Sequence, residues 1–376
     1  EDINANVGFW APQPDFRITE RLSPGFDAFS DLELEAIYED QVTTFVDYQL
    51  RVGLRAIARN PDADLVMLYI EQPDGASHQF LMTDPRQPSD IKNPRSIGLN
   101  QDQAKRARYW NYLRNAYKAA NDAVQRIVEA VGTDYEGRPN SNVLVVSDHG
   151  IAPFHTAVNL NAYLIAKGFD NTRVRAVTSG PAANIYINLA GREPNGIVSR
   201  TEYLALQEAL VKALRELADA NPNYVASRRA LPVFEQLHAR PNPANINDPR
   251  FGHAISPLFG QDSGDVYAVL RIGYNFDGTQ SPVVSRIDDD AATAQVLSLP
   301  NFYGAHGYDP KHPWMSAIFY AAGPDVCRRK VEQVRNIDIA PTILTLLDVR
   351  PAMTVQGRAI RLCGKPGDDR GRNDDD

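Results

Sequence analysis

The chain has 376 residues, of which 43% are hydrophobic and 23% are charged, and its formal net charge is −8. This acidic balance argues against a nucleic-acid duplex as partner, because binding along a phosphate backbone requires a basic surface. No apolar run approaches the ~20 residues that a membrane-spanning helix needs. At ~100–200 residues per domain, the length suits two domains, or one large α/β unit with an insertion.

The first part of the chain alternates between predicted helices and strands. Residues 64–70 ("DLVMLYI") form an apolar strand, which the loop at residues 71–75 ends. Residues 103–131 have helical spacing of apolar residues, and Gly132 ends that helix. The next strand, residues 142–147, is almost continuously apolar. This order predicts an α/β fold with a mostly parallel sheet covered by helices on both faces.

The middle of the chain has a different character. Residues 183–189 alternate like a half-exposed strand, and a helix begins near Thr201, where Ser199 and Glu202 have capping-box spacing. A loop-rich stretch follows, and strand character resumes at residues 265–272. We interpret residues 176–298 as a smaller inserted or cap region. Residues 1–175 and 299–363 would then form one discontinuous core.

The C-terminal part returns to the core pattern. A strand is predicted at residues 315–322 and a helix at 339–347, and residues 364–376 are a charged tail predicted to be disordered. The two cysteines, Cys327 and Cys363, either form a disulfide in an oxidising compartment or remain free thiols in a reducing one. The sequence leaves both alternatives open.

Metal-capable side chains follow several of the predicted strands. Ligands of open parallel sheets bind at the carboxyl ends of strands, where these residues are expected. Carboxylate and imidazole are suitable zinc ligands where thiolates are lacking. Each residue alone has a plainer explanation, as a helix cap, a turn residue or a core histidine. Together they favour a metal site, and its candidate ligands are Asp74, His78, Asp148, His149 and His306.

The chain resembles the type I phosphodiesterase/nucleotide pyrophosphatase family of the alkaline phosphatase superfamily. The resemblance rests on ordered motifs that cover most of the chain: "YIEQPDGASH", "VVSDHGIAPFHTAVNLNAYLIAKG", "INLAGREPNGIV", "GAHGYDP" and "NIDIAPTILTLLDV". The last motif is shared more widely, and its plainer explanation is that Asp338 caps a helix with Pro341 in its first turn.

The resemblance implies a site for two divalent metal ions, expected to be zinc. Asp74, His78 and His306 would hold one ion. Asp148 and His149 would hold the other, together with an aspartate and a Thr or Ser nucleophile that the family supplies upstream. Such a pair of metals lies ~3.5–4 Å apart and supports in-line attack on phosphorus. The implied activity is hydrolysis of phosphodiester or pyrophosphate bonds in small phosphorylated substrates such as nucleotides, through a covalent intermediate.

The upstream part of the family pattern is not found in this chain. Thr43 and Thr44 lie in an amphipathic stretch that is predicted to be helical, so neither is assigned as the nucleophile. The simplest hypothesis is that the family's N-terminal segment has been removed or persists as a separate, associated chain. An extracytoplasmic location (secreted or periplasmic) is favoured by a family tendency, and a disulfide between Cys327 and Cys363, if formed, would agree with it.

Some further residues are weaker candidates for the pocket. His155, Asn159, Tyr308 and His312 are hypothesised to contact substrate because they lie close in sequence to the candidate ligands. Glu71 is expected to orient a metal ligand.

Two alternatives to the diesterase stay open. One is phosphomonoesterase or phosphoglycerate-mutase-like activity, which uses nearly the same metal ligands. The other is a metal-binding fragment or subunit that is inactive without a separate nucleophile-bearing chain.

Overall fold

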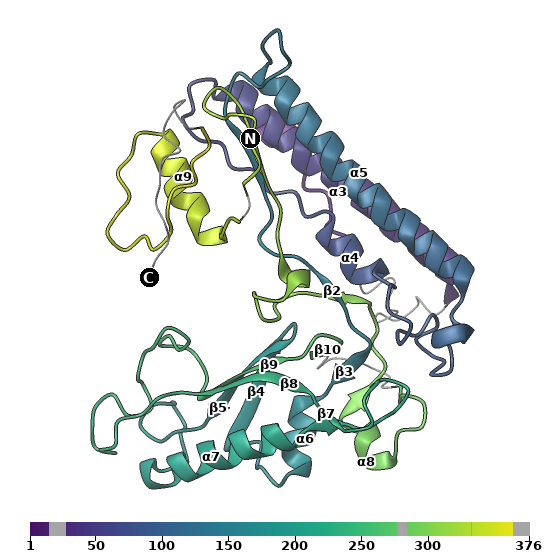
Figure 1. The fold of residues 1–376 in the computed structure, drawn as a ribbon, viewed down its shortest axis with the longest axis vertical. Helices are drawn as coiled ribbons and strands as arrows, with labels where there is room; N and C mark the ends of the chain where they lie inside the picture. The colour runs from purple at the N-terminus through teal and green to yellow at the C-terminus, as the bar shows by residue number, and fades with distance from the viewer. Residues whose placement is uncertain (15–27, 277–283, 332, 364–376) are drawn as a thin grey trace.

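The computed structural model describes residues 1–14, 28–276, 284–331 and 333–363, so the predicted tail lies outside the described residues. Its upper part is built on two helices of 29 residues, α3 (Asp31–Arg59) and α5 (Gln103–Val131), which pack side by side (Figure 1). A capping box between Ser30 and Glu33 begins α3. Helix α5 has the predicted bounds, and Gly132 ends it with a positive φ of 75°.

Short elements complete the upper part. Helix α4 (Asp74–Phe80) packs against α5 and against strand β12 (Gly304–Ala305). Its buried face carries Ala76 and Phe80, which join a core cluster with Tyr38 of α3 and Leu113 of α5. This packing fixes the helix from which Asp74 and His78 project. The remaining short elements here are α1 (Asp2–Asn6) and η2 (Gly98–Asn100).

The lower lobe contains the largest sheet, in the order β4-β5-β9-β8, with every pair antiparallel. Helix α7 lies along β8 and β9, and α6 packs near β4 (Figure 1). The predicted capping box of Ser199 and Glu202 begins α7. The core cluster of this lobe runs from Val158 to Leu297. The bounds are β4 (Val174–Ser179), β5 (Ala182–Ile187), β8 (Phe234–Ala239), β9 (Val266–Leu270), α6 (Leu160–Ala166) and α7 (Arg200–Glu216).

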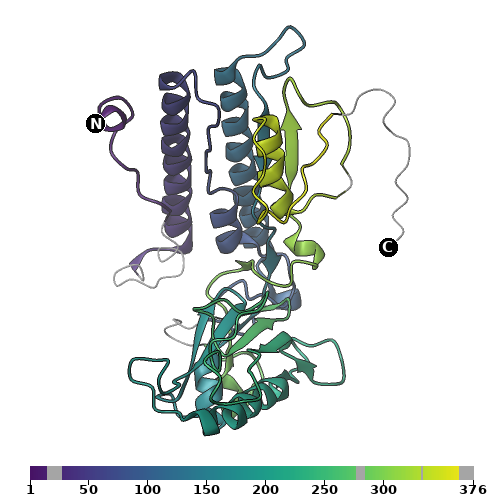
Figure 2. The same ribbon diagram turned by 90° about the vertical axis from the view of Figure 1, so that its left-hand side faces the viewer.

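Four small sheets are found among the described residues besides the largest one. β1 (Val143–Val146) pairs with β13 (Phe319–Ala322), β2 (Ala152–Pro153) pairs with β12, and β6 (Ala218–Asp219) pairs with β7 (Leu231–Pro232), all antiparallel. The fourth small sheet has the order β10-β3-β11. Helix α9 lies apart from the α3–α5 pair in Figure 1, and it contacts η4. Figure 2 shows the α3–α5 pair from a second side. The bounds not yet given are β3 (Thr156–Val158), β10 (Tyr274–Phe276), β11 (Leu297–Ser298), α8 (Ala291–Ala294), η3 (Pro313–Met315), η4 (Asn336–Asp338) and α9 (Ile339–Leu346).

The mixed α/β class is confirmed, but the prediction of a mostly parallel sheet is wrong. Among the named strands of the described residues, only β10 and β3 pair in parallel. The apolar run of β1 suggested a strand buried on both faces, yet β1 is only partly buried and pairs antiparallel with β13. β4 and β5 are antiparallel because residues 180–181 join them directly, and Gly180 adopts a φ of 54° at this turn.

The apolar run at residues 64–70 is extended but is not part of a strand. Leu68 packs near Gly53 of α3, while Met67 is 82% exposed and Tyr69 is 67% exposed. Among the described residues, this segment makes no backbone hydrogen bond. This segment therefore has the residue composition of a strand, but it does not pair with another strand in the described part of the chain.

A buried ionic network stabilises the junction of the lower lobe with β3. Arg286 donates to Asp219 (2.6 Å) and to Asp289 (2.8 Å), and all three side chains are almost fully buried. Arg286 also donates to Thr156 of β3 (3.0 Å), and its guanidinium lies over the ring of Tyr224. Burial raises the pKa of Asp219, but the hydrogen bond and charge of Arg286 outweigh it and hold that pKa below its ordinary value.

Two features concern the ends of the fold. Cys327 and Cys363 form a disulfide, so the pairing of the two cysteines is confirmed. In the described part of the chain, no helix has the length and apolar character needed to cross a membrane.

Candidate metal centre

Three of the predicted ligands meet at one place. Asp74 Oδ2 lies 3.4 Å from His78 Nε2, and Asp74 Oδ1 lies 3.9 Å from His306 Nε2. One ligand atom from each side chain can be chosen so that all lie within 4.8 Å of one another. The three side chains are partly exposed, at 27–34% of their surface, so the group is open to solvent on one side.

Local structure explains this meeting. Asp74 and His78 are four residues apart on α4, so they share one face of that helix. His306 directly follows β12, which packs against α4. The Nδ1 of His78 lies 2.7 Å from the carbonyl oxygen of Gly304. When Nδ1 donates to that carbonyl, Nε2 is the atom that can bind a metal ion together with Asp74, as in many metal-ligating histidines.

The second predicted pair adjoins the first group. Asp148 and His149 follow β1, with 3.4 Å between Asp148 Oδ2 and His149 Nε2. The ring of His149 stacks on that of His306, with centroids 3.6 Å apart. The carboxylate of Asp148 is 72% exposed, whereas His149 is 27% exposed. The structure thus brings all five predicted side chains into one continuous cluster.

Gly150 directly follows Asp148 and His149. It is not among the glycines with positive φ, so its backbone conformation does not itself require glycine. A Cβ at this position would lie 2.1 Å from the carbonyl oxygen of Trp314. Glycine is therefore required at position 150 because the backbone of residue 314 approaches too closely for any side chain.

The electrostatics of the cluster favour cation binding near neutral pH. Burial, followed by the charges of His149 and His78, lowers the pKa of His306 to about 4. Burial raises the pKa of Asp74, but hydrogen bonding to His78 and the charges of the imidazoles outweigh it, so that pKa lies below its ordinary value. His306 is therefore neutral and Asp74 ionised at pH 7, the states in which both can act as ligands.

The donor set suits a small divalent ion. In a tetrahedral zinc site with bonds of ~2.0–2.1 Å, neighbouring ligand atoms lie ~3.3 Å apart. The distances of 3.4 Å within Asp74–His78 and within Asp148–His149 are close to this value. Asp74 Oδ1 and His306 Nε2 are 3.9 Å apart, and a small side-chain movement would bring them to the same spacing. Imidazole and carboxylate donors also fit zinc better than calcium or magnesium.

The four weaker candidates have other roles in this structure. Asn159 accepts from Ala162 N (3.1 Å) and caps α6. Tyr308 is buried and donates to the carbonyl of Tyr274 (2.8 Å). His312 accepts from Trp314 N (3.3 Å) and caps η3. His155 is fully buried beside Gly273, so its ring does not face solvent here.

His155 leads to a prediction about pH. Burial, with the charge of Arg86, lowers the pKa of His155 to about 3, whereas an unfolded histidine has a pKa of about 6.5. Between these values the unfolded chain binds the extra proton, so stability is complete above pH 6.5 and falls as the pH is lowered. In urea titrations of metal-free protein, we expect His155 to contribute a loss of about 1.4 kcal/mol per pH unit below pH 6.

The matched variants are His155→Gln, which should remove this slope, and His253→Gln, which replaces an exposed histidine and should keep it. Equal slopes in wild type and His155→Gln would contradict the prediction.

The helix predicted around Thr43 and Thr44 is confirmed as part of α3, where the Thr43 hydroxyl donates to the carbonyl of Glu39 (3.0 Å).

Beside the cluster, Glu71 accepts from Gln13 (2.8 Å), and burial raises the pKa of Glu71. Sequence reasoning missed Gln13 because it lies 58 residues from Glu71 in a stretch without a motif.

Comparison with known proteins gives one family. The family model described as type I phosphodiesterase / nucleotide pyrophosphatase matches residues 1–309, a range that includes all five clustered side chains. No curated protein matches the chain.

Proposed function

We propose, from the premise that this chain belongs to the type I phosphodiesterase / nucleotide pyrophosphatase family, a two-zinc hydrolase of phosphodiester or pyrophosphate bonds in nucleotide-like substrates. The family supports hydrolysis of this general class. The single observation that carries the two-zinc proposal is the adjacency of two sets of side chains: ligand atoms of Asp74, His78 and His306 lie within 4.8 Å of one another, and the ring of His149, next to Asp148, stacks on that of His306.

Each side chain has a role in this proposal. Asp74, His78 and His306 hold one ion, and Asp148 and His149 contribute to the other. Bound zinc would supply Lewis-acid stabilisation of the oxygens that attack and leave phosphorus. The carbonyl of Gly304 keeps His78 in one tautomer, and the lowered pKa of His306 keeps its imidazole neutral.

The lower lobe is proposed to shape the pocket for the leaving group. Its β4–β5 turn reaches the centre, because a Cβ at Gly180 would lie 2.9 Å from the carbonyl oxygen of His306. Gln236 of β8 also donates to Asp309, three residues after His306, at 2.7 Å. The inserted region of residues 176–298 therefore has direct contact with the loop that carries a metal ligand.

The family's covalent Thr or Ser intermediate is part of the proposal, although no residue of this chain is assigned to it. The comparisons give no support for a separate nucleophile-bearing chain. The Cys327–Cys363 disulfide supports the proposal of an oxidising, extracytoplasmic compartment.

The test compares two chromogenic substrates with the purified protein. Turnover of bis(p-nitrophenyl) phosphate well above that of p-nitrophenyl phosphate is expected, together with loss of turnover after chelation and recovery with Zn²⁺. Preference for the monoester would favour the phosphomonoesterase alternative. Full zinc loading without turnover of either substrate would favour the non-catalytic alternative.

A further inference from the structure

The turn that carries Asp148 and His149 is held by hydrogen bonds to later parts of the chain, before, at and after Asp148. The backbone N–H of Ser147 donates to Ile318 (3.2 Å), and that of Gly150 donates to Met315 (3.1 Å). Between them, the carbonyl of Asp148 accepts a hydrogen bond of 2.5 Å from the side chain of Asn336, which is 188 residues away in sequence. Asn336 belongs to η4, which lies in the C-terminal segment of the chain.

The segment that contains Asn336 is held in place by further contacts of its own. Asp338, two residues later, accepts from the guanidinium of Arg335 (2.8 Å) and from the backbone of Arg358 (2.9 Å). The hydrogen bond from Arg335 lowers the pKa of Asp338 to about 2. Asp338 occupies the N-cap position of α9 but makes no capping hydrogen bond, so its predicted role as a helix cap is replaced by these contacts. Gly357 packs so closely that a Cβ would lie 1.7 Å from the carbonyl of Ile337.

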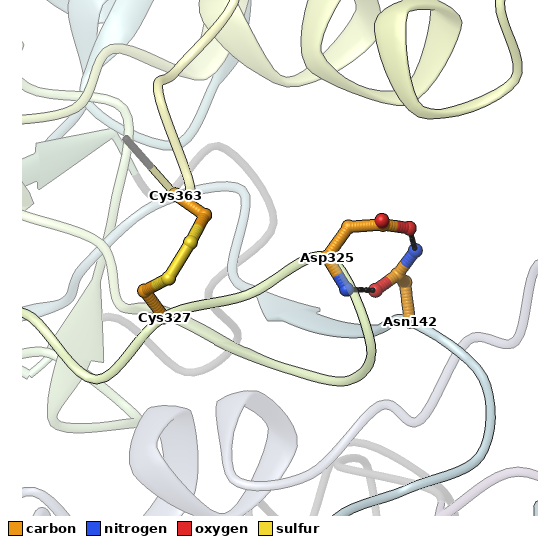
Figure 3. The surroundings of a disulfide bond; sticks show 4 residues. All are labelled: Asn142, Asp325, Cys327 and Cys363. Carbon is orange, nitrogen blue, oxygen red and sulfur yellow. Dashed lines mark hydrogen bonds between the residues drawn. A yellow bond between two sulfur atoms is a disulfide. The ribbon is translucent and has the colours of Figure 1, made fainter. Parts of the chain in front are cut away.

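The other end of β1 has a similar contact. Asn142 donates to the carboxylate of Asp325 (2.7 Å) and accepts from its backbone N–H (3.1 Å), next to the Cys327–Cys363 disulfide (Figure 3). The disulfide closes the segment that contains Asn336, with a sequence separation of 36. Two asparagine contacts therefore tie the two ends of one strand to one C-terminal segment. Only the contact of Asn336 lies at the metal-capable end, ~20 Å along the strand from Asn142.

We propose that Asn336 is a positioning residue for the second metal: by holding the Asp148 carbonyl, it fixes the backbone from which the Asp148 carboxylate and the His149 imidazole project. This inference rests on the proposed function for the role of the metal. The placement of the His149 ring does not depend on that function and can be measured without metal.

The test uses Asn336→Ala, the isosteric Asn336→Asp, which removes the donor, and Asn142→Ala as matched control. Zn²⁺ affinity is measured by competition with a chromogenic chelator. Both Asn336 variants are expected to bind the ion at Asp148 and His149 about 10-fold more weakly, with the ion at Asp74 unchanged. Asn142→Ala is expected to lower the urea midpoint to a similar extent while keeping both affinities.

A second measurement needs no metal. In metal-free protein, the NMR signals of the His149 ring should shift in both Asn336 variants, because its stack on His306 is disturbed, and those of His78 should not. Unchanged His149 signals, or an equal loss of affinity in Asn142→Ala, would overturn the inference. If Asp148→Asn leaves zinc content unchanged, the two-metal proposal fails, while the His149 signals still decide whether Asn336 positions the turn.

Discussion

Replacing His306 by alanine is expected to remove the zinc ion from the Asp74–His78–His306 group and to lower phosphodiester hydrolysis by roughly 100-fold or more. His306 supplies one of the three ligand atoms of that group, and its ring also supports the ring of His149. The variant should therefore disturb both predicted metal sets. Zinc content after dialysis, measured by mass spectrometry, and turnover of bis(p-nitrophenyl) phosphate are the two readouts.

The control for this variant is His253→Ala, which removes an exposed imidazole of the lower lobe. It should retain wild-type zinc content and turnover. Asp148→Asn separates the two sets, because it should lower zinc at the second set and leave the first occupied. Unchanged zinc in both His306→Ala and Asp148→Asn would remove the basis for the ligand assignment.

Replacing Arg286 by alanine is expected to destabilise the lower lobe by about 3–5 kcal/mol, because removing one partner of a buried ionic network leaves charges uncompensated. Asp219 and Asp289 would both remain in a site where their side chains are almost completely buried. The loss of free energy of unfolding is measured by urea titration at pH 7.

Arg250→Ala is the matched control, since the pair that Arg250 forms with Asp248 lies at the surface. An exposed pair contributes about 0–1 kcal/mol, so this variant should be close to wild type. Equal destabilisation in the two arginine variants would show that burial of the network has no special effect. Arg286→Met retains much of the side-chain volume that Arg286→Ala removes. Comparing the two variants should therefore separate the loss of charge from the creation of a cavity.

Helix ends could be predicted from the sequence because their signals are local. The capping box of Ser199 and Glu202 and the terminal Gly132 act within a few residues, and both appear where expected. Strand direction is a different matter, because it depends on which segment supplies the partner. β1 finds its partner in β13, more than 170 residues later, and nothing within β1 specifies the direction.

The candidate site shows the same division. Asp74, His78, Asp148, His149 and His306 could be found because each lies in a short motif after an apolar run. The buried location of His155 could not be predicted from the sequence, because it depends on packing against Gly273, more than 100 residues away. Asn336 lies inside a motif that was recognised, yet only the folded chain brings it to Asp148.

The two main core clusters of the described residues have a consequence for how stability is measured. One lies among α3, α4 and α5, the other lies in the lower lobe, and they have no residue in common. If the two parts unfold in separate steps, the two-state assumption fails. A single melting temperature would then average two transitions. The free energy assigned to Arg286 belongs to the lower unit, whereas metal binding at Asp74 stabilises the upper one.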